Sequence, residues 1–295
     1  MEKSFSFDPA ASRAFLFGEA FFTTMLYKDG RFLFLEDHWQ RISKSWCYLF
    51  SADQIHTVLD LWAEKLELTL QQLQESSKRK AICRFTFSMD TEGSSLFSVG
   101  GTPSIEIKIR DYPSIASEYL DVQLSFQKKC PKTLIPSFFK KTFYLDSILE
   151  KRQASSQGWD DVVFLDTSDN FAEATTSNIF FIKGSTLVTP KLSSCVLDGI
   201  TRRKIIESAE EIGLLVDVRN IHKSEADSFE FGFLSNSIKK SVPIRKMGVD
   251  ASHFEFSHFS EIYNSIVTQH DKKIDNYVRE SEKVDRQMRS LQEEI

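Results

Sequence analysis

Apolar residues along this chain recur with two periods, at every second position and at every third to fourth, which together predict strands and helices. In the first 120 residues the predicted strands are 21–27, 31–36, 81–89 and 104–112, and the predicted helices are 37–50 and 53–76. Asp29 and Gly30, between the first two strands, favour a tight hairpin turn. This part of the chain is therefore expected to form a sheet with helices packed on it.

The second half repeats the mixture after an irregular segment. A strand at 120–126 leads into 128–141, which has two prolines, many charges and little periodicity, and so predicts a connector. Helices are predicted at 142–157, at 200–213 and from about 256, and strands at 161–166, 178–183, 186–189, 214–219 and 229–235. We expect a mixed α/β (α+β) fold with a smaller domain at 1–122, a connector at 123–136 and a larger domain at 137–295.

Residues 271–295 are strongly charged. Val284, Met288, Leu291 and Ile295 follow the 4-3-4 spacing of a coiled-coil seam, but fewer than two heptads carry it. A charged terminal helix exposed to solvent is therefore the expectation.

Composition narrows the class of protein. The chain has 37 basic and 42 acidic side chains, and this mild negative charge argues against nucleic acid as the main partner. It lacks an apolar run of about 18 residues that would span a membrane and the apolar core of a signal peptide. The four cysteines are scattered, and the Cys and His residues lack zinc-site spacing. We expect a reduced, cytoplasmic protein without a metal site.

Two segments offer hydrogen-bond donors to an anion. Residues 198–199, Asp-Gly, precede an amphipathic helix with Thr201 in its first turn, where the amide groups, the helix dipole and the hydroxyl favour a phosphate. Alone this signal is weak, because most helix starts bind only water and a cap. Residues 235–237, Ser-Asn-Ser, follow an apolar strand and form either further donors to an anion or a simple turn.

Two adjacent lysines are candidates for a nucleophile. Lys140 and Lys141 precede the helix predicted at 142–157 and are flanked by Phe139 and Phe143. Apolar surroundings disfavour the ammonium form, and the neutral amine is the form that attacks a carbonyl. Two solvated lysines at a domain edge are the alternative interpretation.

Two further charged residues stand at informative positions. Glu173 precedes small hydroxyl residues and an apolar strand, so its carboxylate either points into a cleft or is exposed in a turn. Arg41 follows His38 by three residues on a predicted helix, which puts both on one face. The guanidinium group suits a phosphate because it donates two parallel hydrogen bonds, and a surface ion pair with Asp37 is the alternative.

The order of these features resembles that of one enzyme family. A hairpin followed by His-x-x-Arg, a lysine before a helix, Glu-x-x-x-x-Asn before an apolar strand, Leu-x-Gly-Ile-Thr-Arg, and Ser-Asn-Ser before Val-Pro resemble the class IV, fold-type IV pyridoxal-phosphate enzymes. That family includes branched-chain and D-amino-acid aminotransferases and aminodeoxychorismate lyase. The resemblance runs from about Arg13 to Pro243. It implies two domains, an active site between them, and a homodimer.

The resemblance also implies pyridoxal 5'-phosphate as the cofactor and a role for individual residues. Lys140 resembles the Schiff-base lysine, with Lys141 as the alternative. Glu173 resembles the carboxylate that keeps the pyridine nitrogen protonated, and Asn178 resembles an asparagine that supports the structure. The residues that resemble the phosphate-binding group are Arg41, Ile200, Thr201 and Ser237.

Around the substrate the resemblance is less complete. Phe22 and Tyr144 resemble an aromatic residue that faces the substrate and one that orients the lysine. The first strand, however, has Ala20 and Thr23 where the family usually has Gly and Glu. Residues 90–103 contain no arginine, whereas many relatives bind the substrate carboxylate with one there.

The implied activity is transfer of an amino group between an amino acid and a 2-keto acid, which would be the small-molecule partners. Aminodeoxychorismate lyase, which forms 4-aminobenzoate and pyruvate, is the alternative, because the Phe-Thr-Thr run at 22–24 resembles those lyases. A catalytically degenerate relative that only binds a ligand or partner is the alternative from a different class. The complete set of cofactor residues argues against it.

Overall fold

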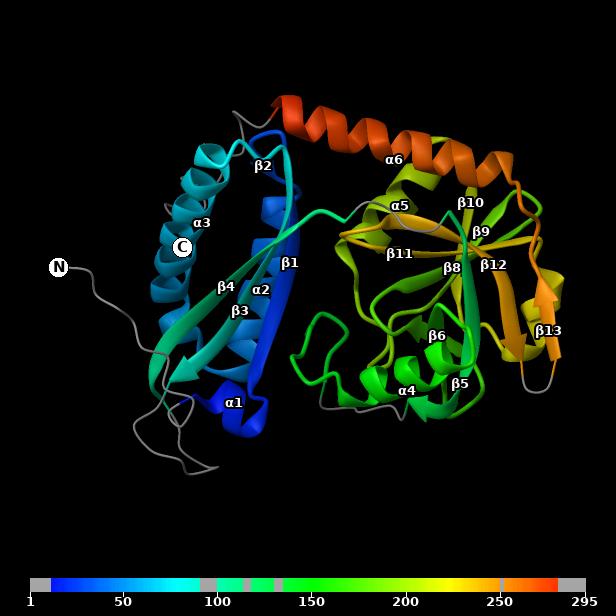
Figure 1. The fold of residues 1–295 in the computed structure, drawn as a ribbon, viewed down its shortest axis with the longest axis horizontal. Helices are drawn as coiled ribbons and strands as arrows, with labels where there is room; N and C mark the ends of the chain where they lie inside the picture. The colour runs from blue at the N-terminus through cyan, green and yellow to red at the C-terminus, as the bar shows by residue number, and fades with distance from the viewer. Residues whose placement is uncertain (1–11, 91–99, 114–117, 130–134, 250–251, 281–295) are drawn as a thin grey trace. The chain divides into compact units, whose positions relative to one another are not determined.

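The computed structural model describes residues 12–90, 100–113, 118–129, 135–249 and 252–280 (Figure 1). Its chain divides into two units. The first contains the described residues up to Asp111 together with 139–143, and the second contains those of 112–138 and 144–280. The lysine pair therefore belongs to the first unit. The predicted coiled-coil seam at 284–295 lies outside the described residues.

The first unit is a four-stranded antiparallel sheet with helices on one face. Its elements are α1 (Arg13–Phe17), β1 (Ala20–Lys28), β2 (Arg31–Phe32), α2 (Leu35–Leu49), the 3₁₀ helix η1 (Ala52–Gln54), α3 (Ile55–Glu75), β3 (Lys80–Asp90) and β4 (Thr102–Asp111). The strand order is β2-β1-β3-β4. Figure 1 shows α2 and α3 side by side along this sheet. Their facing rings, Trp39 and Trp62, stack with centroids 5.5 Å apart.

The two faces of this sheet differ. Phe21 and Phe85 pack against Trp46 and Trp62 of the helices, so their face is the apolar one. Side chains alternate along a strand, and the paired positions Phe22–Thr86 and Thr24–Arg84 of β1 and β3 therefore lie on the other face. That face is more polar, and in β4 it carries the exposed residues Glu106 and Lys108.

The predicted strand at 31–36 is wrong beyond Phe32. β2 contains only Arg31 and Phe32, and α2 begins at Leu35. Phe34 has a φ of 56°, in the left-handed region, which ends extended backbone and starts the helix. The apolar residues Leu33 and Leu35 are buried all the same, so the hydrophobic pattern reports their burial rather than a strand.

The second unit contains a nine-stranded mixed sheet. Its strands are β5 (Leu120–Lys129), β6 (Asp161–Asp166), β7 (Phe171–Ala174), β8 (Asn178–Lys183), β9 (Thr186–Pro190), β10 (Leu215–Arg219), β11 (Phe231–Asn236), β12 (Lys240–Val249) and β13 (Ser252–Glu255). The order is β10-β9-β8-β11-β12-β5-β6-β7, and β13 pairs with β12. Its helices are α4 (Leu145–Ser156), α5 (Ile200–Glu211), the 3₁₀ helix η2 (Lys223–Ser228) and α6 (Glu261–Glu280).

Both faces of this sheet are buried at its centre. In β8, Phe180 stacks on Phe233 in a cluster that includes side chains of α5 and α6, whereas Phe181 stacks on Phe229 in a separate cluster. A strand covered on both faces is apolar throughout, which is why the run at 178–183 is easy to find. The prediction of this strand is confirmed.

The pattern missed β7, β12 and β13. β12 contains Pro243, which usually argues against a strand, and its pairing with β5 is irregular between Ile244 and Lys246. These features break the alternation on which the prediction depends. The last helix begins at Glu261 rather than near 256, because β13 precedes it.

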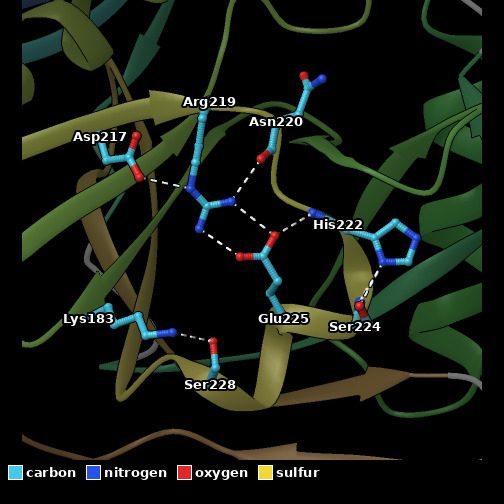
Figure 2. Close-up of polar contacts among 8 residues, drawn as sticks. All are labelled: Lys183, Asp217, Arg219, Asn220, His222, Ser224, Glu225 and Ser228. Carbon is cyan, nitrogen blue, oxygen red and sulfur yellow. Dashed lines mark hydrogen bonds and ion pairs between the residues drawn. The ribbon is translucent and has the colours of Figure 1, made fainter.

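A polar network fixes the start of η2, as Figure 2 shows. Glu225 accepts hydrogen bonds from Arg219 Nη1 at 3.0 Å, from Arg219 Nη2 at 2.7 Å and from the His222 amide at 3.0 Å. Arg219 Nε also donates to Asp217, at 2.8 Å. The His222 ring in turn accepts from the Ser224 amide, so the two side chains cap η2 reciprocally.

Two negative findings apply to the described ranges. Within them, no helix combines the length and the apolar character needed to cross a membrane. Among the same residues, no three His, Cys, Asp or Glu side chains are grouped so as to hold a metal ion.

Candidate active site

Backbone hydrogen bonds to the start of β1 hold the lysine segment. The Phe22 amide donates to the Lys140 carbonyl at 2.9 Å, and the Thr142 amide donates to the Ala20 carbonyl at 3.2 Å. Phe139 is buried and lies 5.6 Å from Phe21, ring to ring. The segment expected to be a loose connector is therefore fixed here like an additional short strand.

The two lysines lie against different rings. Lys140 Nζ lies 5.1 Å from the centroid of Phe22, and Lys141 Nζ lies 4.3 Å from the centroid of Phe143. Neighbouring side chains of extended backbone point to opposite sides, which explains the divergence. Lys140 is thus the lysine that lies beside the residue predicted to face the substrate.

Arg84 was not anticipated from the sequence. Its guanidinium carbon lies 3.7 Å from the centroid of the Phe22 ring, and its Nε donates to Thr86 Oγ1 at 3.3 Å. The Phe22 side chain is buried, and both Arg84 and Lys140 place their cationic groups against its ring. The available signal was an arginine and a threonine alternating with buried residues in β3.

Arg41 belongs to a buried network in the first unit. Its Nη2 donates to Thr23 Oγ1, which also shares a hydrogen bond of 2.5 Å with His38 Nδ1. Arg41 and His38 lie one helical turn apart, as their spacing predicted. Thr23 stands where the family usually has Glu, so within this network Arg41 contacts a neutral hydroxyl.

Glu173, on β7, is held by two donors of the second unit. Its Oε1 accepts from Lys129 Nζ at 2.8 Å, and its Oε2 accepts from the Leu197 amide at 2.8 Å. Its side chain is 18% exposed. These bonds argue against an exposed turn carboxylate, the alternative left open by the sequence.

Lys129 was also missed, because it falls in the segment interpreted as a connector. Its ammonium lies 4.7 Å from the centroid of Phe164, and its carbonyl accepts from Cys195 Sγ at 3.4 Å. Burial raises the pKa of the Cys195 thiol, so this thiol stays protonated near neutral pH. The surroundings of Lys129 are thus packed and partly apolar.

The start of α5 approaches a neighbouring strand closely. Asn178 Nδ2 donates to the Leu197 carbonyl at 2.8 Å. A Cβ on Gly199 would lie 2.2 Å from Asn178 Oδ1, so only glycine fits here. Gly199 is the N-cap and makes no side-chain cap, which leaves the first amides of α5 to other acceptors. Asn178 has the supporting role expected of it.

Hydroxyl groups gather at this helix start. Thr201 Oγ1 donates to Ser237 Oγ at 3.5 Å. Ser235, two residues earlier on β11, is 1% exposed, and its Oγ has no hydrogen-bond partner among the described residues. Arg202, the next residue of α5, is buried, and burial lowers the pKa of its guanidinium group. The Arg202 side chain itself donates from Nη2 to the Pro190 carbonyl at 3.0 Å. The amides and hydroxyls at this helix N-terminus are therefore the groups that suit a phosphate.

The candidate residues are divided between the units. Phe22, Arg41 and Lys140 belong to the first, and Glu173, Ile200, Thr201 and Ser237 belong to the second. Tyr144 also belongs to the second, where its carbonyl accepts from the Ile148 amide at the start of α4. Its orienting effect on the lysine stays a prediction.

Comparison with known proteins gives the family. A sequence model described as amino-transferase class IV matches residues 20–247. A probable branched-chain-amino-acid aminotransferase of Rickettsia bellii is 27% identical over 210 residues, 68% of either chain. Aminodeoxychorismate lyase of Bacillus subtilis is 28% identical over 141 residues, 48% of this chain and 47% of that one. The chain spans only 32% of the length of some other branched-chain relatives.

Solved structures agree on the fold. The crystal structure of a putative 4-amino-4-deoxychorismate lyase from Legionella pneumophila superposes with a TM-score of 0.78 at 22% identity, covering 92% of this chain and 96% of that one. At this identity the likeness shows the fold alone, which is that of the fold-type IV enzymes.

Proposed function

This chain belongs to the class IV aminotransferases, a pyridoxal-phosphate-dependent family, and on that premise we propose that it transfers an amino group between an amino acid and a 2-keto acid. One observation carries the proposal. The Leu197 amide that binds Glu173 lies three residues before Ile200, the first residue of α5. A carboxylate and a phosphate-binding helix start are thus joined by one short segment, as the two ends of one cofactor require.

The residues of the chain fit pyridoxal 5'-phosphate. The first amides of α5 and the hydroxyls of Thr201 and Ser237 would bind the phosphate, to which Arg41 would add its guanidinium group. The buried Ser235 Oγ, without a partner among the described residues, supports an acceptor near this helix start. Glu173 would accept a hydrogen bond from the ring nitrogen.

The chemistry follows from these positions. When bound, the cofactor supplies an electron sink for the carbanion formed at the substrate Cα. Lys140 would hold the cofactor through its amine and, once displaced by the substrate, act as the base that takes the Cα proton. Glu173, with one donor on each oxygen, would keep a fixed orientation throughout.

Aminodeoxychorismate lyase is the second candidate. Thr23 hydrogen-bonds with His38 and Arg41 where the family usually has Glu, and this part of the chain resembles the lyases. Both activities use the same cofactor residues. They differ in whether the substrate carries a leaving group that is eliminated as pyruvate is formed.

The cofactor assignment is tested by borohydride. The purified protein is expected to be yellow, and reduction followed by peptide mass mapping is expected to find the cofactor on Lys140. Lys141→Ala is the matched control and should keep both colour and label, whereas Lys140→Ala should lose the label. A label on Lys141, or on no lysine, contradicts the proposal.

The activity is tested with two assays on the same preparation. A panel of amino donors with a keto acid detects amino transfer, and aminodeoxychorismate alone detects pyruvate release. Amino transfer supports the aminotransferase, and pyruvate release supports the lyase. A colourless protein that forms neither product would indicate the degenerate binding relative.

We also propose a homodimer. α4 exposes Leu145, Ile148 and Leu149, which share one helix face. A stripe of exposed apolar residues is typical of a surface that another chain covers. Light scattering after size-exclusion chromatography should give twice the 34.0 kDa of one chain.

We further propose a cytoplasmic location. Cys47, Cys83 and Cys195 are free thiols in the described part of the chain. Free thiols are typical of a reducing compartment. Fractionation of the source cells would test the location directly.

A further inference from the structure

The turn between β11 and β12 is held by the side chain of the residue that precedes it. Asn236, the last residue of β11, accepts hydrogen bonds at Oδ1 from the Ile238 amide at 2.9 Å and from the Lys239 amide at 2.8 Å. An asparagine side chain bonded in this way imitates a backbone turn. The end of the turn is also constrained, because Lys240 has a φ of 60°, in the left-handed region. Ser237 therefore lies in a turn with a defined conformation.

The same side chain ties this turn to a second segment. Asn236 Nδ2 donates to Ser177 Oγ at 2.9 Å, and Ser177 is buried. The next residue, Asn178, donates to the Leu197 carbonyl just before α5. Because Oδ1 meets two amide donors and Nδ2 meets a hydroxyl oxygen, these partners fit one orientation of the asparagine amide. The turn thus has a fixed position relative to the start of α5.

The Ser237 hydroxyl differs from the other polar groups of this turn. The Ile238 carbonyl, for example, accepts from the Tyr112 hydroxyl at 3.1 Å. Among the described residues, the Ser237 hydroxyl has one hydrogen-bond partner, Thr201 Oγ1, which donates to it at 3.5 Å. A serine hydroxyl is also a donor. The Ser237 side chain therefore keeps its O–H for an anion at the first turn of α5.

We propose that Asn236 is a positioning residue, which directs the Ser237 hydroxyl to the phosphate of the cofactor. This inference rests on the proposed function, which assigns Ser237 to the phosphate-binding group. Asn236 uses Oδ1 for two amides and Nδ2 for Ser177, so it acts on the phosphate through the turn. A hydroxyl on a fixed turn loses little conformational freedom on binding, which increases the affinity.

The test uses two ligands that differ only in the phosphate. Pyridoxine 5'-phosphate has no aldehyde, so its binding needs no Schiff base with Lys140, and pyridoxine lacks the phosphate. The full-length protein, freed of cofactor, is titrated with each by calorimetry. Asn236→Ala should raise the Kd of pyridoxine 5'-phosphate about tenfold, the size expected for one hydrogen bond to a charged group, and leave that of pyridoxine unchanged. An equal loss for both ligands, or no loss, overturns the proposal.

A double-mutant cycle shows whether Asn236 acts through Ser237. Ser237→Ala alone should also raise the Kd of pyridoxine 5'-phosphate about tenfold. In the Asn236→Ala background the same substitution should change this Kd by less than about twofold, because the hydroxyl is no longer directed at the phosphate. Additive losses would mean that Asn236 only stabilises the fold, and they would contradict the proposal.

Two further variants control for unfolding and for nonspecific effects. Ser177→Ala removes only the partner of Nδ2, so we expect a smaller loss that depends in the same way on the phosphate and on Ser237. If Asn236→Ala does not fold, wild-type affinity in Ser177→Ala would contradict the proposal. Asn264→Ala changes an exposed asparagine of α6 and should match the wild type.

The same titrations separate this inference from the proposed function, because they depend on neither turnover nor the Lys140 label. A phosphate-dependent loss in Asn236→Ala supports the inference even if borohydride labels no lysine. A labelled Lys140 together with unchanged binding of pyridoxine 5'-phosphate in Asn236→Ala would leave the proposed function intact and overturn the inference.

Discussion

Glu173 and Glu225, both in the second unit, are held by the same kinds of donor but differ in where those donors come from. Each accepts a hydrogen bond from one backbone amide and forms an ion pair with one basic side chain. The donors to Glu225 lie within six residues of it, whereas those to Glu173 lie 24 and 44 residues away. Glu225 thus fixes a local cap, and Glu173 depends on the whole fold of the unit.

The donors also differ in how fully they occupy the carboxylate. The guanidinium group of Arg219 bonds to both oxygens of Glu225, and the His222 amide adds a third bond, as Figure 2 shows. Lys129 and the Leu197 amide give Glu173 one bond on each oxygen. A carboxylate accepts about four hydrogen bonds, so Glu173 retains more capacity for a further donor. The proposed hydrogen bond from the cofactor ring nitrogen would use this remaining capacity of Glu173.

The largest expected effect comes from exchanging each carboxylate for an amide. Glu173→Gln should lower turnover by about a hundredfold or more, because the ring nitrogen loses its anionic partner. Glu225→Gln is the matched control and should leave turnover unchanged. Steady-state kinetics of both variants at saturating cofactor measures the difference. Similar activity in the two variants would remove the distinction between the carboxylates.

A smaller effect is expected at the start of α5. In Gly199→Ala the new Cβ would displace the Asn178 side chain from the Leu197 carbonyl, at a cost of about 1–3 kcal/mol in the free energy of unfolding. Cofactor affinity should fall as well, because the first amides of α5 shift. Denaturant unfolding of the apoprotein and cofactor titration measure the two effects.

Asn178→Ala provides the control for that prediction. In this background the Gly199→Ala substitution should cost less, because the crowding oxygen is gone. A double-mutant cycle that finds the two costs additive would mean that Asn178 is not what restricts residue 199.

The contrast between local and distant partners also explains what sequence can predict. The strand at 178–183 is apolar from Ile179 to Ile182 and was predicted with its observed limits, because its burial on both faces leaves a clear pattern. The spacing of His38 and Arg41 was likewise enough to place them on one helix face. Both features can be recognised from the order of residues within one short segment.

Features that depend on distant partners were missed. Nothing near Lys129 in the sequence indicates its ion pair with Glu173. Likewise, nothing near Arg84 indicates that it lies, like Lys140, against the Phe22 ring. The prolines and charges around Lys129 instead suggested an irregular connector. The left-handed φ of Phe34 gave no signal either, because glycine, the usual residue there, is absent.

The smallest expected effect concerns Glu225 and is a change in how the free energy of unfolding depends on pH. Hydrogen bonds from Arg219 lower the pKa of Glu225 below its usual 4.5. A folded-state pKa below the unfolded value means that the unfolded chain binds the proton first as the pH falls. The contribution of Glu225 to stability is therefore fully present above about pH 4.5 and is lost as the pH falls through its folded-state pKa.

The side chains of Arg219 and Glu225 are each 33% exposed, so solvent screening limits this contribution to about 0.5–1 kcal/mol. The free energy of unfolding, measured between pH 3 and pH 7, should fall less steeply with acid in Glu225→Gln than in the wild type. Asp217→Asn, which removes the neighbouring partner of Arg219, should keep most of the wild-type slope. If the three profiles ran parallel, Glu225 would contribute no more to the free energy of unfolding than an exposed carboxylate does. Its pairing with Arg219 would then not stabilise the folded protein.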